Sequence, residues 1–241
     1  NNGWFVKADA KKIWHDKKYQ DRESELLLLM QEFKLTYYNE TSKKYIVPSK
    51  LPEDTEELPE WNTSGNVRLH LRYDWLPRPV ATQLIVSLHD HIVQLDEKQQ
   101  WIWRKGAVLD GKKLDLKDAQ VRIMDNWRER QIEIHARGSS CELLIRTVMQ
   151  KWREIHAPYE DKVSVSKIIL CNCEKCQTER QPFEFQYEQV LNAKEKNKPL
   201  RCNNSLEDFD AADILRGVFD ETTVLVDTLQ FKGSRSELLD F

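Results

Sequence analysis

The spacing of hydrophobic and polar positions changes several times along the chain, and each change predicts an element. In residues 21–33, apolar side chains recur every three or four positions, which indicates an amphipathic helix. Two short β-prone runs, 34–38 and 44–48, flank a polar Asn-Glu-Thr-Ser segment and predict a hairpin. A shorter helix over 8–14 precedes them. We therefore expect residues 1–58 to form a winged-helix-like unit.

Three prolines and four acidic residues between Pro48 and Pro59 disfavour packing, so we expect a domain boundary near residue 60, with a linker over 59–66. From Val67 to Tyr73, apolar residues alternate with arginine and histidine, which predicts a strand with one buried face. The same criteria predict further strands over 101–109, 119–123, 132–136 and 163–170, and helices over 80–94, 141–156, 183–194 and 211–218.

These elements predict an α+β fold: a winged-helix-like N-terminal piece, an antiparallel sheet with packed helices, and a small cysteine-containing C-terminal region. We expect residues 67–217 to form the second domain, with a cysteine-rich insert over 168–204. Residues 218–241 would form a C-terminal tail.

Composition narrows the class of protein. The chain has 241 residues, and 37 Lys plus Arg against 40 Asp plus Glu give a net charge of −3, which disfavours a strongly basic nucleic-acid binder. No apolar run approaches the roughly 20 residues that a membrane-spanning helix needs. Five cysteines are an odd number, which fits a reducing compartment better than a disulfide framework. We therefore expect a cytoplasmic protein without a membrane span.

The cysteines also contain the one motif with chemical content. Cys171, Cys173 and Cys176 are crowded together, and Cys202 follows at a distance. Thiolates at these spacings can turn into one tetrahedral Zn²⁺ site, which the distant cysteine would close. Four cysteines leave no open coordination position, so such a zinc would be structural. The other interpretation is a set of free thiols.

No enzyme motif is visible in the sequence. It contains no phosphate-binding loop, no dinucleotide-binding glycine turn and no nucleophile elbow. A metal-dependent enzyme would need an open site with a base nearby, and none is apparent. Eight tryptophans are a high number, and they fill cores or anchor interfaces between protein copies.

Six segments together resemble the COR domain of Roco proteins, which follows a Ras-like Roc GTPase domain. They are Trp4–Trp14, Leu26–Phe33, Tyr45–Pro52, Arg72–Pro77, Gln83–His89 and Trp103–Leu109. The Tyr-Asp-x-Leu-Pro, Leu-Ile-Val-x-Leu-His and Trp-Arg-x-Gly runs are specific in combination. The four clustered cysteines are similar to those of prokaryotic members, which implies a prokaryotic source.

The resemblance implies that residues 1–58 are the end of the first COR subdomain and that 67–217 are the second. COR domains are not catalytic; they link the GTPase domain to the rest of the chain, which in this family includes leucine-rich repeats. The second subdomain pairs with its copy in a dimer, and we expect the exposed faces of 141–156 and of the segment after Val163 to take part. Tyr73 matches a family tyrosine at the boundary with the GTPase domain. The simpler interpretation is that its ring only packs, and the two are compatible.

The alternative from another class is a winged-helix plus zinc-ribbon module that binds nucleic acid. A ribbon normally has two Cys-x-x-Cys knuckles, whereas here the second knuckle is the single Cys202. The mixed charges also argue against this alternative, because nucleic-acid binders concentrate basic residues on one face.

Overall fold

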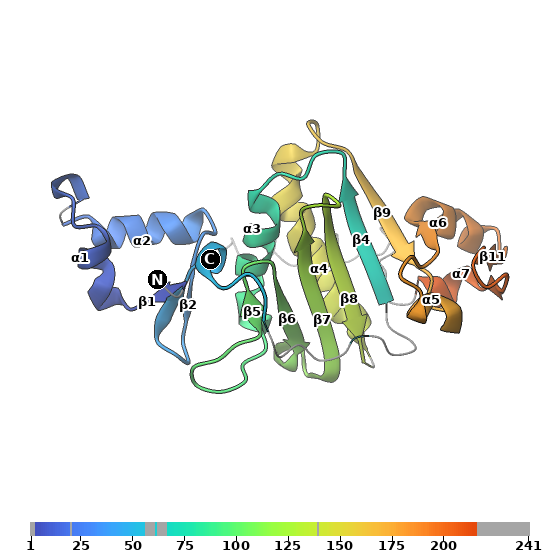
Figure 1. Ribbon diagram of the computed structural model, residues 1–241, viewed down its shortest axis with the longest axis horizontal. Helices are drawn as coiled ribbons and strands as arrows, with labels where there is room; N and C mark the ends of the chain where they lie inside the picture. Colours follow the sequence, from blue (N-terminus) through green and yellow to red (C-terminus); the bar gives the residue numbers. More distant parts are fainter. Residues whose placement is uncertain (1–2, 20, 56–60, 62–66, 139, 216–241) are drawn as a thin grey trace, which may run out of the picture.

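The computed structural model describes residues 3–19, 21–55, 61, 67–138 and 140–215. Three parts follow one another in a row: a small N-terminal unit, a large sheet with two helices against it, and a small C-terminal region of short helices (Figure 1). All strand pairs are antiparallel, and the predicted α+β class is confirmed.

The N-terminal unit contains a three-stranded sheet in the order β1-β3-β2, with two helices beside it. Its elements are β1 (Trp4–Phe5), α1 (Ala10–Ile13), α2 (Glu23–Glu32), β2 (Tyr37–Asn39) and β3 (Lys44–Ile46). The predicted hairpin is β2–β3, and a helix, α2, forms within the predicted range 21–33. Its expected buried stripe is not observed: Leu27 is the buried residue of α2, whereas Leu29 and Phe33 are 50% and 62% exposed. The sequence pattern did not indicate β1, because two residues are too short to establish a period.

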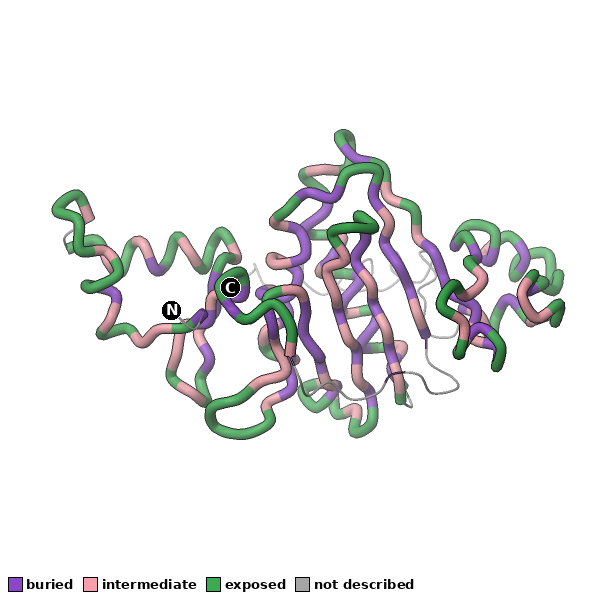
Figure 2. Tube along the Cα trace, viewed as in Figure 1, coloured by how far each residue is buried: buried purple, intermediate pink, exposed green. Residues whose placement is uncertain are grey.

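The central sheet has seven strands in the order β10-β9-β4-β8-β7-β6-β5. Its strands are β4 (Val67–Tyr73), β5 (Ile102–Trp103), β6 (Gly106–Gly111), β7 (Leu116–Asn126), β8 (Gln131–Arg137), β9 (Val165–Leu170) and β10 (Glu184–Gln186). The alternation that predicted β4 is real, since Leu69 and Leu71 are fully buried. On the other face of β4, Arg68 and Arg72 are half-buried and His70 is buried. Buried and half-buried segments likewise alternate along other strands of the sheet (Figure 2).

Two helices, α3 (Pro79–Ser87) and α4 (Cys141–His156), pack against one face of this sheet (Figure 1). The bounds of α4 are those that the sequence predicted, because its apolar stripe is clear and its other face is polar. Leu144, Ile145 and Val148 on that stripe are buried in the main core. Burial of each such side chain contributes about 1.5–3 kcal/mol relative to exposure.

Three predicted elements are divided where the sequence pattern indicated a single element. The helix expected over 80–94 ends at Ser87, and Ile92 instead pairs with Leu109 in an isolated β-bridge. Residues 101–109 form the hairpin β5–β6 rather than one strand. The helix expected over 183–194 begins with the edge strand β10 and continues as α6 (Tyr187–Glu195). In each case apolar residues stand on both sides of the break, so their spacing alone did not reveal it.

A second apolar cluster lies on the open face of the sheet, near β5 and β6, and contains Trp61, Val93, Trp103 and Val108. Trp61 belongs to the predicted linker, yet only 4% of its surface is exposed. The guanidinium carbons of Arg122 and Arg137 lie 5.2 and 4.6 Å from the centre of its ring. At least this residue of the segment is therefore packed on the sheet, and the domain boundary itself stays a prediction.

The N-terminal unit contacts the central part through buried side chains. The Tyr37 hydroxyl donates to Gln100 Oε1 at 2.8 Å, and Arg104 Nε donates to the Leu51 carbonyl at 3.0 Å. Tyr37 and Leu51 are both members of the main core. A cleft of about 760 Å³ lies beside this junction, between β2 and the turn at His89.

The C-terminal region is built from short elements. They are α5 (Glu174–Thr178), α6, β11 (Leu200–Arg201), β12 (Asp208–Phe209) and α7 (Ala211–Ile214). The predicted tail over 218–241 lies outside the described residues. Within the part of the chain that the structure describes, no helix is both long and apolar enough to span a bilayer.

Candidate metal centre and partner-contact region

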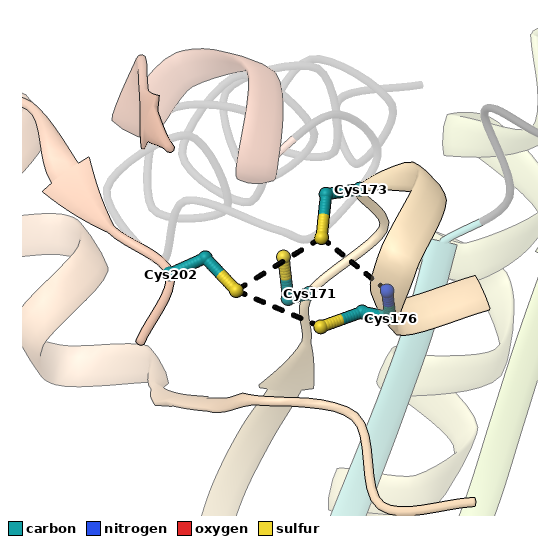
Figure 3. Close-up of side chains that lie close together, drawn as sticks. All are labelled: Cys171, Cys173, Cys176 and Cys202. Carbon is teal, nitrogen blue, oxygen red and sulfur yellow. Dashed lines mark hydrogen bonds between the residues drawn. The ribbon is translucent and has the colours of Figure 1, made fainter. Parts of the chain in front are cut away.

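Three elements bring the four predicted cysteines together. Cys171 follows the last residue of β9, Cys173 caps the N-terminus of α5 and Cys176 lies within α5. Cys202 follows β11 directly. All four side chains are at least 94% buried, and their sulfur atoms point to a common centre (Figure 3).

The distances between the sulfur atoms suit one shared cation. All four Sγ atoms lie within 4.8 Å of one another, and Cys202 Sγ lies 3.6 Å from Cys176 Sγ and 3.9 Å from Cys173 Sγ. Tetrahedral zinc with Zn–S bonds of about 2.3 Å places its sulfurs about 3.8 Å apart. The chain contains no disulfide among the described cysteines.

Backbone amides donate to the sulfurs, as expected for atoms that carry negative charge. The N–H of Cys176 donates to Cys173 Sγ at 3.4 Å, and the N–H of Phe183 donates to Cys176 Sγ at 3.3 Å. Burial raises the pKa of the Cys176 thiol to about 11. Burial also acts on Cys202, but hydrogen bonds from Ser205 and Asn204 outweigh it and lower the pKa of that thiol to about 7. The cluster therefore fits a soft divalent cation held by four thiolates, and a closed site of this kind stabilises a fold.

A second group of possible ligands, His70, Glu133 and His135, lies on the open face of the sheet. It does not fit a metal ion. Arg122 donates to His135 Nδ1 at 3.1 Å, so the proton of that ring is on Nε2. His135 Nε2 then donates to His70 Nε2 at 3.3 Å, which occupies both nitrogen atoms that would face the cation. If His135 Nε2 bound a metal, the ring proton would move to Nδ1, where Arg122 now donates. The guanidinium of Arg122 would therefore have to be displaced.

Tyr73, the predicted partner-binding residue, ends β4 and is 2% exposed. Its hydroxyl accepts a hydrogen bond from Trp152 Nε1 at 2.7 Å, and its ring meets His156 edge-on at 5.7 Å between centroids. Burial raises the pKa of Tyr73 to about 12. The residue is therefore fixed inside its own domain in this structure.

Exposed aromatic and basic side chains lie beside Tyr73, in the loop that follows β4 and in the turn between β7 and β8. Trp75 is 59% exposed and Trp127 is 42% exposed. The guanidinium carbon of Arg78 lies 5.5 Å from the centre of the Trp127 ring. Arg130 Nη1 donates to the Asp74 carbonyl at 2.7 Å and so ties the turn to the loop. We refer to Trp75, Arg78 and Trp127 as the Trp75 surface.

The sequence matches a known protein family. The model of the "C-terminal of Roc, COR-B domain" family matches residues 64–217, which is more than half of the chain. This chain belongs to the COR-B family. No curated protein matches the sequence. The expected resemblance to a Roco COR domain is thereby confirmed.

The structure explains why the resembling motifs contain the residues they do. In the Tyr-Asp-x-Leu-Pro run of this COR-B chain, Asp74 Oδ1 accepts hydrogen bonds from the N–H groups of Trp75 at 2.7 Å and Ser164 at 3.0 Å. Leu76 is 1% exposed and anchors the loop in the core. In the Trp-Arg-x-Gly run, Gly106 pairs with Trp103 across the hairpin, and a Cβ at Gly106 would lie 2.5 Å from the Trp103 ring.

Two features of this region were not predicted from the sequence. The partner of Tyr73 is Trp152, 79 residues away, and no local pattern connects a strand end with a distant helix. The sequence left open which tryptophans fill the core and which are exposed, and it did not single out Trp75 and Trp127. Their position in proline- and asparagine-containing turns was the available signal that they face solvent.

Proposed function

We propose that this chain is the dimerisation and scaffold part of a Roco protein, without catalytic activity of its own. It would couple a neighbouring Ras-like Roc GTPase domain to self-association and to the rest of the chain. The observation that carries the proposal is the COR-B match over residues 64–217. GTP binding and hydrolysis would belong to the separate Roc domain of a cytoplasmic signalling protein with leucine-rich repeats.

The Trp75 surface supports contact with the GTPase domain. Tryptophan and arginine are enriched among the residues that dominate binding energy at interfaces. Trp75 and Trp127 are both exposed, whereas Tyr73 is not. Tyr73 would therefore act on the partner indirectly, by holding the loop that carries Trp75.

The test of this contact uses a longer chain that contains the GTPase domain. Trp75→Ala and Trp127→Ala should each weaken the contact between the domains by about tenfold or more. Trp4→Ala is the matched control, because Trp4 is also 42% exposed but belongs to the N-terminal unit. Domain contact is measured by cross-linking yield, and GTP hydrolysis in parallel. Equal behaviour of all three variants would refute the contact surface.

Self-association is tested by the solution mass of the 241-residue chain across a concentration series. A dimer has twice 28.6 kDa. Of the two expected dimer surfaces, the exposed face of α4 offers Leu143, 45% exposed, beside Arg146 and Gln150. Leu143→Glu should lower the dimer fraction if this face takes part. A monomer at every concentration would refute self-association through these residues.

We further propose that Cys171, Cys173, Cys176 and Cys202 hold one structural zinc ion. The four-sulfur donor set and its spacing support zinc over harder cations, which prefer oxygen ligands. Elemental analysis of protein purified without added metal should give one zinc per chain. Absence of metal after purification and after reconstitution with Zn²⁺ would leave these residues as buried thiols.

The nucleic-acid alternative gains no support from the arginines of the sheet. Arg72 is paired with Glu184, and Arg122 is engaged by His135 and Trp61. Phosphate contacts require basic side chains that are free to face the backbone of the nucleic acid. We therefore do not expect binding to DNA or RNA.

A further inference from the structure

Arg68 connects the centre of the large sheet to the cysteine cluster. It lies on β4, and its side chain extends from the open face of the sheet toward the loop after β9. Its Nη2 donates to the carbonyl oxygen of Cys171 at 2.5 Å and to that of Cys176 at 3.3 Å. Both acceptors belong to residues whose sulfur atoms form the cluster.

The charge of Arg68 lacks a carboxylate partner among the residues that the structure describes. Arg72, on the same strand and face, shows the usual arrangement: its two terminal nitrogens donate to the two carboxylate oxygens of Glu184 at 2.9 and 2.6 Å. A partly buried guanidinium that meets only neutral carbonyl groups is unfavourable, because arginine stays charged at all ordinary pH values. We therefore expect the charge of Arg68 to be balanced by a nearby negative group other than a carboxylate.

Four thiolates around one divalent cation supply that charge. Each thiolate carries −1 and Zn²⁺ carries +2, so a closed four-cysteine centre has a net charge of −2. Groups that contact metal ligands from outside commonly set the affinity for the metal. Hydrogen bonds to the carbonyl groups of Cys171 and Cys176 place the guanidinium beside this centre and hold the loop that presents two of its ligands.

We propose that Arg68 is the counter-cation of a tetrathiolate zinc centre and that it makes zinc affinity depend on the central strand of the sheet. The inference rests on the proposed structural zinc. It assigns Arg68 a positioning role, since the side chain contacts the backbone of the ligand residues and does not bind the metal itself. It also predicts that charge, rather than hydrogen bonding alone, is what the site requires.

Two substitutions separate charge from hydrogen bonding. Arg68→Lys keeps the positive charge and loses the planar fork, whereas Arg68→Gln keeps an amide donor and loses the charge. Arg72→Gln is the matched control, because Arg72 shares the strand and the face but pairs with Glu184. The dissociation constant for zinc is measured on the 241-residue chain by competition with a chromogenic chelator. The absorption spectrum of the cobalt-substituted protein reports whether four sulfurs still bind.

Arg68→Gln should raise the dissociation constant for zinc by about 10- to 100-fold, as for other residues that contact metal ligands from outside. Arg68→Lys should stay within about threefold of the unaltered protein, and so should Arg72→Gln. The chelated, metal-free proteins provide a second readout of thermal stability. There, Arg68→Gln should be at least as stable as the unaltered chain, because the uncompensated charge is gone. A residue with only a structural role would destabilise both forms.

The possible failures are distinct. If the unaltered protein binds no zinc, both the proposed metal centre and this inference are wrong. If it binds zinc and Arg68→Gln binds equally tightly, the metal centre stands and the role of Arg68 is refuted. If Arg68→Lys loses as much affinity as Arg68→Gln, hydrogen-bond geometry rather than charge governs the site, and the inference is likewise refuted.

Discussion

The indole N–H of Trp152 donates a hydrogen bond to the hydroxyl of Tyr73 at 2.7 Å, and both side chains are buried. This contact joins the end of β4 to the last turns of α4, where the His156 ring stacks on Trp152. The loop that carries Trp75 begins one residue later. A change at Tyr73 therefore acts first on the packing of its own domain and only then on the neighbouring exposed loop.

Tyr73→Cys should destabilise the domain far more than Tyr73→Phe. The phenylalanine variant keeps the ring and leaves Trp152 Nε1 without its acceptor, which costs roughly 1–3 kcal/mol. The cysteine variant also leaves a cavity where the ring was, and large-to-small substitutions of buried aromatic residues cost about 3–5 kcal/mol. Urea unfolding measures both. Similar losses for the two variants would contradict the burial of the ring.

A double-mutant cycle isolates the hydrogen bond between the two residues. Trp152→Phe combined with Tyr73→Phe should show a coupling energy of about 0.5–3 kcal/mol, as residues in direct contact do. Trp127→Phe is the control for the same change of residue type, since Trp127 is exposed and contacts Arg78 instead. Additive effects of the first pair would argue against the contact.

The sequence predicted correctly the helices and strands whose hydrophobic residues follow a single period. Where tertiary contacts break an element, the sequence pattern did not show the break. The alternation in β4 and the apolar stripe of α4 are complete within one element, so both were found with correct bounds. The division of 101–109 into two strands depends on the pairing of Trp103 with Gly106 across Arg104 and Lys105, and the apolar residues on either side of that pair suggested one strand instead. The four cysteines were predicted because thiolate spacing is itself chemical information, and the structure brings them together.

The roles of single residues depended on distant neighbours and could not be predicted. Nothing in the sequence around Arg68 indicates that its side chain reaches Cys171, 103 residues away. Tyr73 was predicted as a partner-binding residue from a family resemblance, and that role stays a prediction. The Tyr73 side chain is buried against Trp152 and His156 of its own domain. The sequence identified residue types that can bind a metal or a partner. Which of these residues contact one another became clear only from the fold.

Gly106→Ala should destabilise the β5–β6 edge of the sheet. An added Cβ would meet the Ile123 carbonyl oxygen and the Trp103 ring, and neither can move without disturbing the sheet or its second apolar cluster. Overpacking of this kind costs about 1–3 kcal/mol. Urea unfolding measures the loss, and Ser166→Ala on the exposed part of β9 serves as the control. If Gly106→Ala leaves the free energy of unfolding unchanged, the β5–β6 edge can shift to accommodate the added Cβ without loss of stability.

Stability should fall as the pH drops below about 6.5, because of the pair formed by His70 and His135. Burial lowers the pKa of both rings; Glu133 and Glu184 partly oppose this at His70, while Arg122 reinforces it at His135. Both are thus neutral in the folded protein at pH values where the unfolded chain, with a histidine pKa near 6.5, already binds protons. The stabilisation is complete above about pH 6.5 and is lost on acidification, at up to about 1.4 kcal/mol per histidine and pH unit.

The double variant His70→Gln/His135→Gln tests this assignment. Glutamine can accept from Arg122 and donate across the pair without titrating. The difference in the free energy of unfolding between the variant and the unaltered chain should therefore change in favour of the variant from pH 7 to pH 5. The remaining histidines are common to both proteins and cancel. A difference that is constant with pH would assign the acid sensitivity to other groups.

Cys202→Ser should abolish stoichiometric zinc binding and lower the stability of the C-terminal region, whereas Cys141→Ala should leave the metal in place. Cys202 closes the cluster from β11, and a serine oxygen is a poor substitute for a thiolate on zinc. Cys141 is equally buried but belongs to α4, outside the cluster.

At a free zinc concentration 1,000-fold above the dissociation constant, loss of zinc binding in Cys202→Ser removes about 4 kcal/mol of stabilisation. Hydrogen exchange should then rise more in α5 and α6 than in β7 and β8, because β9 and β4 lie between those two strands and the cluster. One zinc per chain in Cys202→Ser would show that the ion is held elsewhere.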